Sequence, residues 1–461
     1  MMRPIQWATG SNQTRAEAAN GSRLVNLYAE GLPPDSKTPV ALYGTPGTWP
    51  FSRLPTAPVK ALHRLNEKLY AVTATNLYYV DHAGKYTDIG AVDQAGAVSA
   101  ATNGIDLVFV DGKRGYAYNE TDGLRELSGD GWYPATTVTY QDGYFIFNRA
   151  GTGQFFLSDL LSTGFDPLRF ATAEGAPDDT VAVLSDHREL WVFGTHSIEV
   201  WYNSGDVDFP FERMQGAFIE KGCQAPHSAD KLDNTVFWLG DDGIVYRASG
   251  YQPMRISTHA IEARIGNHNP DATAYTYIEE GHAFYVLTLP SKSLTVVFDV
   301  STGLWHERSH YQWGRHHAEC HVYAYGQHLV GDFQNGHIYT MALNIHTDNT
   351  DEIRRIAVSP PLHANRRRAT MHRLELDMES GVGLVTGQGD NPQAMLQWSD
   401  DGGRTWSHEY WSAIGKSGNY LTRVAWNRLG MFRQRQYRVQ ISDPIPVAIL
   451  GAYAEVEDAR H

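Results

Sequence analysis

The sequence predicts an all-β protein: a β-propeller of about seven blades, with six also possible, followed by a small antiparallel β-sandwich or sheet domain. A repeat carries this prediction. Pairs of apolar segments separated by a short turn recur along the chain at steps of 38, 37, 46, 46, 48 and 44 residues. One four-stranded propeller blade occupies roughly 40 to 50 residues. The copies begin at Leu69, Leu107, Tyr144, Leu190, Val236, Phe284 and His328.

Each copy has the composition of a β-hairpin. Its segments are rich in Val, Phe, Tyr, Trp and Leu, which suit a half-buried pleated sheet, and turn formers such as Asn335-Gly336 accompany them. Shorter apolar segments flank the hairpins, upstream at 59–65, 98–101, 136–140 and 181–185 and downstream at 86–89, 124–127, 211–214 and 254–257. Four strands in each unit and little helical periodicity predict a radial array of sheets.

A further regularity follows the copies at Leu190 and Phe284. The strand ends in Asp or Asn, and a glycine and an aromatic residue come next, as in Asp299, Gly303 and Trp305. Glycine supplies the positive φ of a tight turn, and we expect the tryptophan to fill the wedge between adjacent blades.

The flanks of the repeat differ from it. Residues 1–58 hold eight prolines and predict an extended arm, which either closes the ring as a stray strand or reaches a neighbouring subunit. The propeller is assigned to residues 59–345. From residue 346 to 461 longer strands replace the repeat and predict the second domain, with a linker near Pro360-Pro361. The expected strands are 372–378, 394–398, 421–426, 436–441 and 447–456.

Composition narrows the protein class. The 461 residues include 42% hydrophobic ones, enough for sizeable cores. Cys223 and Cys320 fall in different predicted blades, so we expect no disulfide framework and folding in a reducing cytoplasm. The N-terminus lacks an apolar signal core, and no run approaches the roughly 18 apolar residues of a membrane span. We therefore expect no membrane span.

Charge is uneven along the chain, whose formal net charge is −14. Residues 346–461 hold 14 Lys and Arg against 14 Asp and Glu, which leaves 24 basic and 38 acidic residues in 1–345. The whole acidic excess therefore lies in the arm and propeller, and such a surface repels phosphate.

One complete motif lies in the second domain. Ser399, Asp401, Gly403, Thr405 and Trp406 match the S-x-D-x-G-x-T-W pattern of the Asp-box, which is common in sialidases and other glycan-active propellers. We interpret it as a structural hairpin turn: the aspartate accepts hydrogen bonds from turn amides, the glycine takes the difficult backbone angle, and the tryptophan packs underneath. A glycan-binding or glycan-cleaving, sialidase-like propeller is the alternative.

Catalysis has no candidate set of residues in the sequence. The acidic pairs Asp178-Asp179, Asp241-Asp242 and Glu279-Glu280 are interpreted as solvated turn carboxylates, and the phosphate-loop, dinucleotide and nucleophile-elbow patterns are all missing. We therefore expect a protein without enzymatic activity, catalytic residues or cofactor.

A histidine-rich stretch spans residues 306–321. On a strand, His317, Glu319 and His321 would share a face, which is a spacing that a metal needs. No CxxC or HExxH pattern accompanies them, so the prediction is no metal site, and these histidines suit a pH-sensitive subunit contact equally well. The potential ligands are His306, His310, His316, His317, Glu319, Cys320 and His321.

Arg366, Arg367 and Arg368 form the most basic tract. A solvated face is the simplest interpretation. The sharper one is docking onto an acidic protein partner, such as the propeller of an adjacent subunit. DNA contact is weaker, because no groove of interleaved aromatic and basic residues accompanies the tract.

Three stretches resemble a known family. They are VNLYAEG at 25–31 with LYGTPG at 42–47, FGTHSIEVWYNSG at 193–205 with EKG at 220–222, and the hairpin 396–406 with 433–441. Together they resemble the packaged-DNA stabilisation proteins of short-tailed bacteriophages, also called tail hub or nozzle proteins.

The resemblance implies a structural, non-enzymatic virion protein of the phage tail, assembled in the host cytoplasm. It implies a homo-hexamer below the portal and its adaptor, the head-to-tail connector, that extends the DNA channel, binds a tail needle, plug or tailspike, and helps to retain DNA until ejection. Six chains at −14 each carry −84, so DNA would pass without specific binding. No cofactor is implied.

Overall fold

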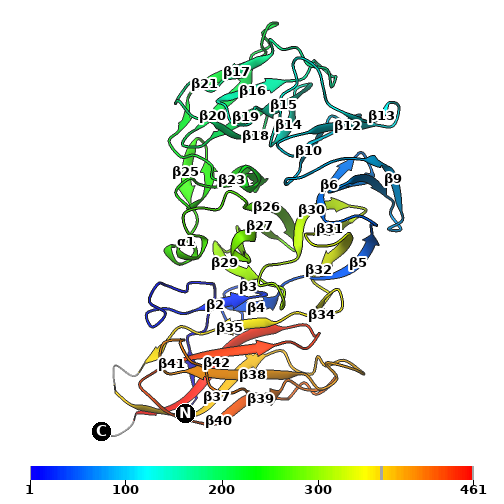
Figure 1. Cartoon of the computed structure of the whole chain (residues 1–461). Coiled ribbons are helices and arrows are strands. Elements are labelled where there is room, and N and C mark those ends of the chain that lie inside the picture. Colours follow the sequence, from blue (N-terminus) through cyan, green and yellow to red (C-terminus); the bar gives the residue numbers. More distant parts are fainter. Residues whose placement is uncertain (1, 364–366, 459–461) are drawn as a thin grey trace.

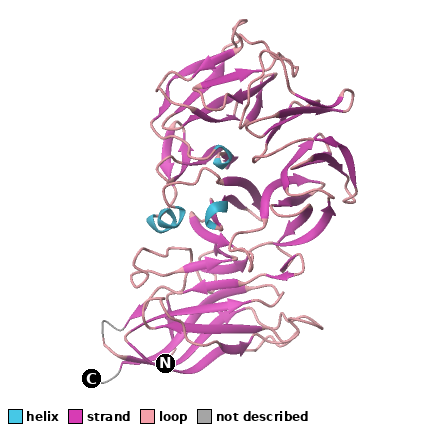
Figure 2. Cartoon of the chain, viewed as in Figure 1, coloured by secondary structure: helices cyan, strands magenta, loops and turns pink. Residues whose placement is uncertain are grey.

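The computed structural model describes residues 2–363 and 367–458. A ring of small sheets forms one end of an elongated molecule, and a two-layered β domain forms the other, with both chain ends beside that domain (Figure 1). Strands dominate throughout (Figure 2). In the described residues there is one α-helix, α1 (His259–Ile265), and two short 3-10 helices, η1 (Pro226–Ser228) and η2 (Pro290–Lys292).

Within the described residues the ring consists of seven four-stranded antiparallel blades, which confirms the predicted propeller. The blades are β6 (Val59–Leu65), β7 (Lys68–Thr73), β8 (Asn76–Val80), β9 (Tyr86–Ala91); β10 (Ser99–Thr102), β11 (Leu107–Val110), β12 (Gly115–Asn119), β13 (Gly123–Glu126); β14 (Val138–Gln141), β15 (Tyr144–Asn148), β16 (Gln154–Leu157), β17 (Phe170–Thr172); β18 (Thr180–Asp186), β19 (Glu189–Gly194), β20 (Ile198–Asn203), β21 (Phe211–Ile219); β22 (Asp230–Leu232), β23 (Thr235–Leu239), β24 (Val245–Ser249), β25 (Gln252–Arg255); β26 (Thr273–Glu279), β27 (His282–Leu289), β28 (Leu294–Asp299), β29 (Leu304–Arg308); and β30 (Ala318–Ala324), β31 (Gln327–Asp332), β32 (His337–Ala342) with β5 (Gly47–Arg53).

The seventh blade closes the ring with a strand from the other end of the chain. Its order is β30-β31-β32-β5, and β5 runs antiparallel to β32 with Ala342 opposite Gly47 and His337 opposite Arg53. The innermost strands β30 and β6 then lie side by side, so blade 7 contacts blade 1. Closure pairs the exposed edge of β32, which a three-stranded blade would leave open.

Apolar side chains fill each wedge between neighbouring blades. Between blades 1 and 2, Tyr70 contacts Tyr118, and Phe109 stacks on Tyr116 with ring centroids 5.5 Å apart. Trp305 is buried between blades 5 and 6, as expected, and its indole N–H donates to the Ile256 carbonyl at 2.9 Å. Gly303 precedes it with a φ of +69°, the left-handed conformation that the sequence predicted.

The second part of the chain is a β-sandwich. One sheet has the order β3-β4-β42-β37-β40 with β1 beside β42, and the other contains β35-β41-β38-β39 with β36 beside β41. Side chains of both sheets, among them Leu374, Trp426, Leu396 and Val439, form one buried core. The bounds are β1 (Arg3–Ile5), β3 (Leu27–Gly31), β4 (Val40–Gly44), β35 (Arg355–Val358), β36 (Leu362–His363), β37 (Ala369–Met378), β38 (Gln393–Ser399), β39 (Tyr410–Ala413), β40 (Val424–Phe432), β41 (Gln434–Ile441) and β42 (Ala448–Asp458).

The N-terminal residues join both parts of the molecule. Within the segment 1–58, β1, β3 and β4 pair in the sandwich, β5 completes blade 7, and β2 (Arg23–Val25) lies between the two parts. β2 pairs parallel to β29 of blade 6 and antiparallel to β35, so one sheet runs without interruption from the propeller into the sandwich. The division of the chain at residues 58 and 345 stays a prediction.

One predicted strand begins too early. The expected strand 421–426 starts at Val424 instead, because Leu421 lies in a turn and is 96% exposed. An apolar side chain on a surface turn cannot be distinguished by composition from one at a strand's start. The hairpin β33 (Thr347–Asp348) and β34 (Asp351–Glu352), which connects the two parts, was not predicted.

Candidate functional site

Charged side chains are buried where the propeller meets the sandwich. Glu307 of β29 is 2% exposed, and its carboxylate accepts hydrogen bonds from Arg23 of β2, at 2.7 and 2.9 Å, and from the Ser11 hydroxyl at 3.2 Å. Arg264 at the end of α1 completes the ion-pair network. Burial alone would raise the pKa of Glu307, but Arg23 and Arg264 outweigh it, so the pKa lies below its ordinary value.

A second buried cation lies nearby on β35. The Arg355 side chain is 1% exposed and donates to the carbonyls of His346 at 3.4 Å and Asp443 at 3.3 Å. Burial lowers its pKa to about 10, while Asp348 acts in the opposite direction. None of these residues was predicted from the sequence. The available signal was the charged pair Glu307-Arg308, which closely follows Trp305, a residue expected to be buried between blades.

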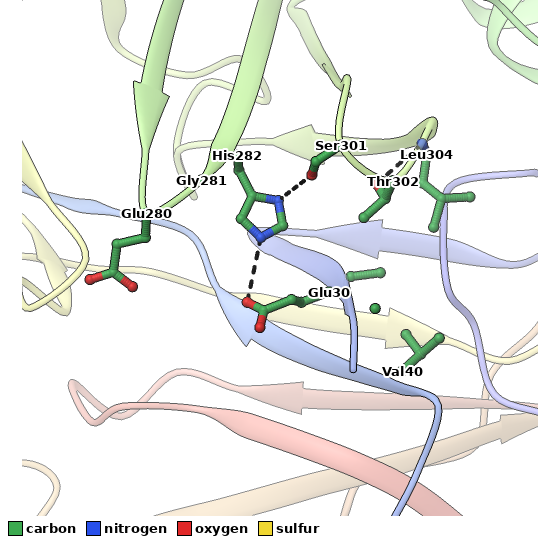
Figure 3. A pocket seen from close by; sticks show the side chains of 10 residues that line it. Glu30, Val40, Glu280, Gly281, His282, Ser301, Thr302 and Leu304 are labelled. Carbon is green, nitrogen blue, oxygen red and sulfur yellow. Dashed lines mark hydrogen bonds and ion pairs between the residues drawn. The ribbon is translucent and has the colours of Figure 1, made fainter. Parts of the chain in front are cut away.

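A pocket of about 430 Å³ opens at the same junction (Figure 3). His282 lies at its centre: one ring nitrogen, Nδ1, is 2.9 Å from the Ser301 hydroxyl and 2.8 Å from Asp299, and Nε2 is 3.4 Å from Glu30 of β3. In an acyl-transfer triad the serine and the carboxylate bond opposite ring nitrogens. Here the Ser301 hydroxyl donates to Asp299 at 2.7 Å, so its hydrogen is engaged by the carboxylate of its own turn, and the contacts of His282 with Glu30 and Asp299 join β3 to blade 6.

The predicted face of His317, Glu319 and His321 does not form. A β-bulge between Ala318 and Cys320 breaks the alternation of β30, which is the physical reason for this error. Glu319 pairs with Arg315, and His321 Nε2 lies 2.9 Å from His328 Nδ1.

One cluster of potential metal ligands exists among the described residues, and it is a different one. His316, His317 and Asp348 place their ligand atoms within 4.8 Å of one another, and all three side chains are buried.

The Asp-box residues form the tip of the hairpin between β38 and β39. Asp401 accepts hydrogen bonds from the amides of Arg404 at 3.0 Å and Thr405 at 2.9 Å, and from the hydroxyls of Ser399 and Thr405. These hydrogen bonds, the Thr405 hydroxyl first, lower the pKa of Asp401. Gly403 has a φ of +91°, and the Trp406 indole donates to its carbonyl at 3.1 Å. The carboxylate is thus engaged by its own turn.

The acidic pairs also bond turn amides. Asp178 accepts from the amides of His196 at 2.7 Å and Ser197 at 2.8 Å, and Asp242 pairs with Lys221 at 2.8 Å. Burial opposes ionisation of Asp178, yet bonds from Thr195 and the amides outweigh it and lower its pKa.

Two residues of the basic tract are exposed. Arg367 and Arg368 follow β36 on the sandwich surface, while Arg366 lies outside the described residues. Their exposure leaves the guanidinium groups accessible to a partner.

The innermost strands surround a cavity of about 970 Å³ in the middle of the propeller. Its charged lining includes Lys60, Lys231 and Arg315 beside Asp230, Asp271 and Glu319. Basic and acidic side chains are equal in number in this lining, so the cavity carries no net basic charge for a nucleic acid. In the described part of the chain, no helix has the length and apolar character of a membrane-crossing one.

Comparisons with known proteins address the whole chain. A family model described as the β-propeller of bacteriophage P22 Gp10 matches residues 22–346, and a model described as the β-sandwich of the same protein matches residues 354–457. The curated proteins gave no match.

Similar solved structures have low sequence identity to this chain. The WD40 propeller domain of Doa1 is 12% identical, with 64% of this chain and 97% of that chain covered and a TM-score of 0.42. BamB from Moraxella catarrhalis is 8% identical, with 74% and 97% covered and a TM-score of 0.41. The computationally designed Ika8 protein is 15% identical, with 69% and 99% covered and a TM-score of 0.40.

Proposed function

The chain belongs to the family of bacteriophage P22 Gp10, a packaged-DNA stabilisation protein, and we propose that it is a non-enzymatic structural component of a phage tail. Six copies form a hub or nozzle ring below the portal and its adaptor, extend the DNA channel, and help to retain the packaged DNA. The match of both family models, in order and over most of the chain, carries this proposal.

The junction between propeller and sandwich suits a ring component. A wall element must hold its two parts in one orientation, and here a continuous sheet and the buried Glu307 network join them. A buried ion pair holds its two partners in one geometry, because any displacement of one partner leaves the other charge uncompensated. The subunit therefore presents its surfaces to neighbours in a fixed arrangement.

Charge supports the proposed conduit. The formal charge of −14 derives from residues 1–345, and six copies surround the channel with an acidic assembly. DNA then slides through without sticking, and retention comes from constriction and from a needle or plug that binds the ring.

The experiment is native mass spectrometry of the purified protein with its adaptor ring. We expect six copies to join one adaptor ring, and a low-resolution image of the particle should show this chain as a sixfold ring beneath a capsid vertex. Persistent monomers in the presence of a competent adaptor would overturn the proposal.

We assign the exposed tract of Arg367 and Arg368, with Arg366, to docking on an acidic protein surface, such as the propeller of the adjacent subunit. Changing Arg367 and Arg368 to Glu should raise the subunit concentration needed for ring formation at least tenfold. The melting temperature of the monomer should stay unchanged. The matched control is Lys416→Glu, because Lys416 is an exposed lysine that follows β39 and lies outside the arginine tract. Equal effects of both changes would contradict the assignment.

A further inference from the structure

His316, His317 and Asp348 come together from two separate segments. The two histidines directly precede β30 of blade 7, and the aspartate lies on β33 in the connection to the sandwich. Their side chains are 3 to 4% exposed, and their ligand atoms lie within 4.8 Å of one another. Elsewhere in the described residues, no other such group occurs.

The polar atoms of this cluster have few partners in the described part of the chain. The Asp348 carboxylate accepts one hydrogen bond, from the Thr48 hydroxyl at 3.4 Å, and forms no ion pair there. His317 Nε2 contacts the same hydroxyl at 3.1 Å, and His316 Nδ1 accepts weakly from the Ala318 amide at 3.3 Å. Buried polar groups are almost always bonded, and a buried carboxylate in particular needs a compensating cation or proton.

We propose that His316, His317 and Asp348 bind a divalent transition-metal ion, with Zn²⁺ as the best match. Two imidazoles and one carboxylate are the donors that zinc takes, at roughly 2.0 to 2.2 Å. The Thr48 hydroxyl or a water completes four ligands. Tetrahedral bonds of that length hold ligand atoms roughly 3.3 Å apart, so the side chains move inward on binding.

Neighbouring cations set the strength of the site. Arg308 and Arg315 act electrostatically on His316, and Arg355 acts on Asp348. Arg315 is neutralised by Glu319, and Arg308 donates to the Tyr277 hydroxyl, but Arg355 bonds carbonyl oxygens. Because these cations repel a bound metal ion, we expect moderate rather than extreme affinity. Asp348 is the one anionic ligand, so metal binding depends on its negative charge.

The bound metal would fasten blade 7 to the connecting hairpin. β33 pairs with β5, the strand that closes the ring, and β34 leads directly into β35 of the sandwich. An ion held by both segments stabilises the folded chain by mass action, since the unfolded chain lacks the assembled site. This role is independent of the proposed tail function.

The test uses the full chain without an affinity tag, stripped with EDTA and then loaded with ZnCl₂ and dialysed. We expect one zinc per chain by elemental analysis, a higher melting temperature than the stripped protein, and, with CoCl₂ in place of zinc, a visible absorption band of tetrahedral intensity. Loss of the band on adding Zn²⁺ ties both metals to one site.

Asp348→Asn and His317→Gln should lower zinc affinity at least tenfold. His321→Gln is the matched control: His321 belongs to a separate, partly buried pair with His328 in the same blade, so this variant should retain the metal. Substoichiometric zinc together with no cobalt band in the folded wild-type protein would overturn the site, a result that needs no variant. Equal zinc retention by Asp348→Asn would overturn it as well.

Discussion

Blades 2 and 3 and the propeller–sandwich junction are held by different forces. Between the blades, Phe147 stacks on Phe156 at 5.1 Å and meets the edge of Trp132 at 5.3 Å, in a wedge filled mainly by apolar side chains. At the junction, the Glu307 carboxylate, which is 2% exposed, bonds the partly exposed Arg23 and Arg264. Apolar contact is non-directional and tolerates repacking, whereas a buried ion pair requires one geometry. Neighbouring blades thus need only complementary apolar surfaces, whereas the junction fixes the orientation of the sandwich relative to the propeller.

Removing the N-terminal strands, which close the propeller and form the junction, should have the largest effect. Deletion of residues 1–53 removes β5 from blade 7 and β2 to β4 from the junction, and it leaves the edge of β32 unpaired. We expect loss of cooperative unfolding and aggregation, measured by circular dichroism and gel filtration. Deletion of residues 1–5, which removes only β1, should leave a cooperative transition. A monomeric, cooperatively folding 54–461 chain would show that neither region needs the N-terminal strands.

Breaking the junction network should come second. Glu307→Ala leaves Arg23 and Arg264, whose side chains are 38% and 24% exposed, without their shared counter-charge, so we expect a loss of about 2 to 3 kcal/mol in the free energy of unfolding. Urea denaturation measures it. Arg188→Ala, which removes an arginine that is 82% exposed from its pair with Asp142, is the control and should cost at most about 1 kcal/mol. Similar losses from both variants would mean that burial does not distinguish the junction.

A conservative change in the apolar wedge should cost less. Phe147→Leu keeps an apolar side chain of reduced volume, and its neighbours can partly close the gap, so we expect a loss of about 1 to 2 kcal/mol. The same urea titrations give the value. A loss larger than that of Glu307→Ala would reverse the comparison between the two regions.

Lowering the pH should change the stability contribution of the junction but not that of the apolar wedge, and this is the smallest expected effect. The pKa of Glu307 is below its ordinary value of 4.5 in the folded chain, so its contribution is present above pH 4.5 and is lost as the pH falls through the folded pKa. The difference in unfolding free energy between wild type and Glu307→Gln should therefore shrink from pH 7 toward pH 3. The cost of Phe147→Leu should stay constant over that range. A gap for Glu307→Gln that widens in acid would refute the ion-pair account.

Most residues of the candidate site could not be predicted from the sequence. The Asp-box turn was predictable because its partners lie within six residues of Asp401. Glu307 has partners 284 residues away in Arg23 and 43 away in Arg264, and no local pattern records such a pairing. The shared face of His317, Glu319 and His321 does not form because one β-bulge in β30 changes which side chains lie together, and the cluster of His316, His317 and Asp348 depends on a residue more than thirty positions away.

The sequence by itself determined the local units of the propeller. Each of the seven repeated hairpins forms the two middle strands of a blade, and the expected segment 59–65 is β6 to the residue. Continuous apolar segments and turn residues encode such pairing within a few tens of residues, and the middle strands are accordingly buried along their length. Only the tertiary structure decided that Gly47 pairs with Ala342, that β2 joins blade 6 to the sandwich, and that Asp348 meets His316 and His317. These contacts depend on how finished sheets stack around a ring, and that arrangement is a property of the whole chain rather than of any segment.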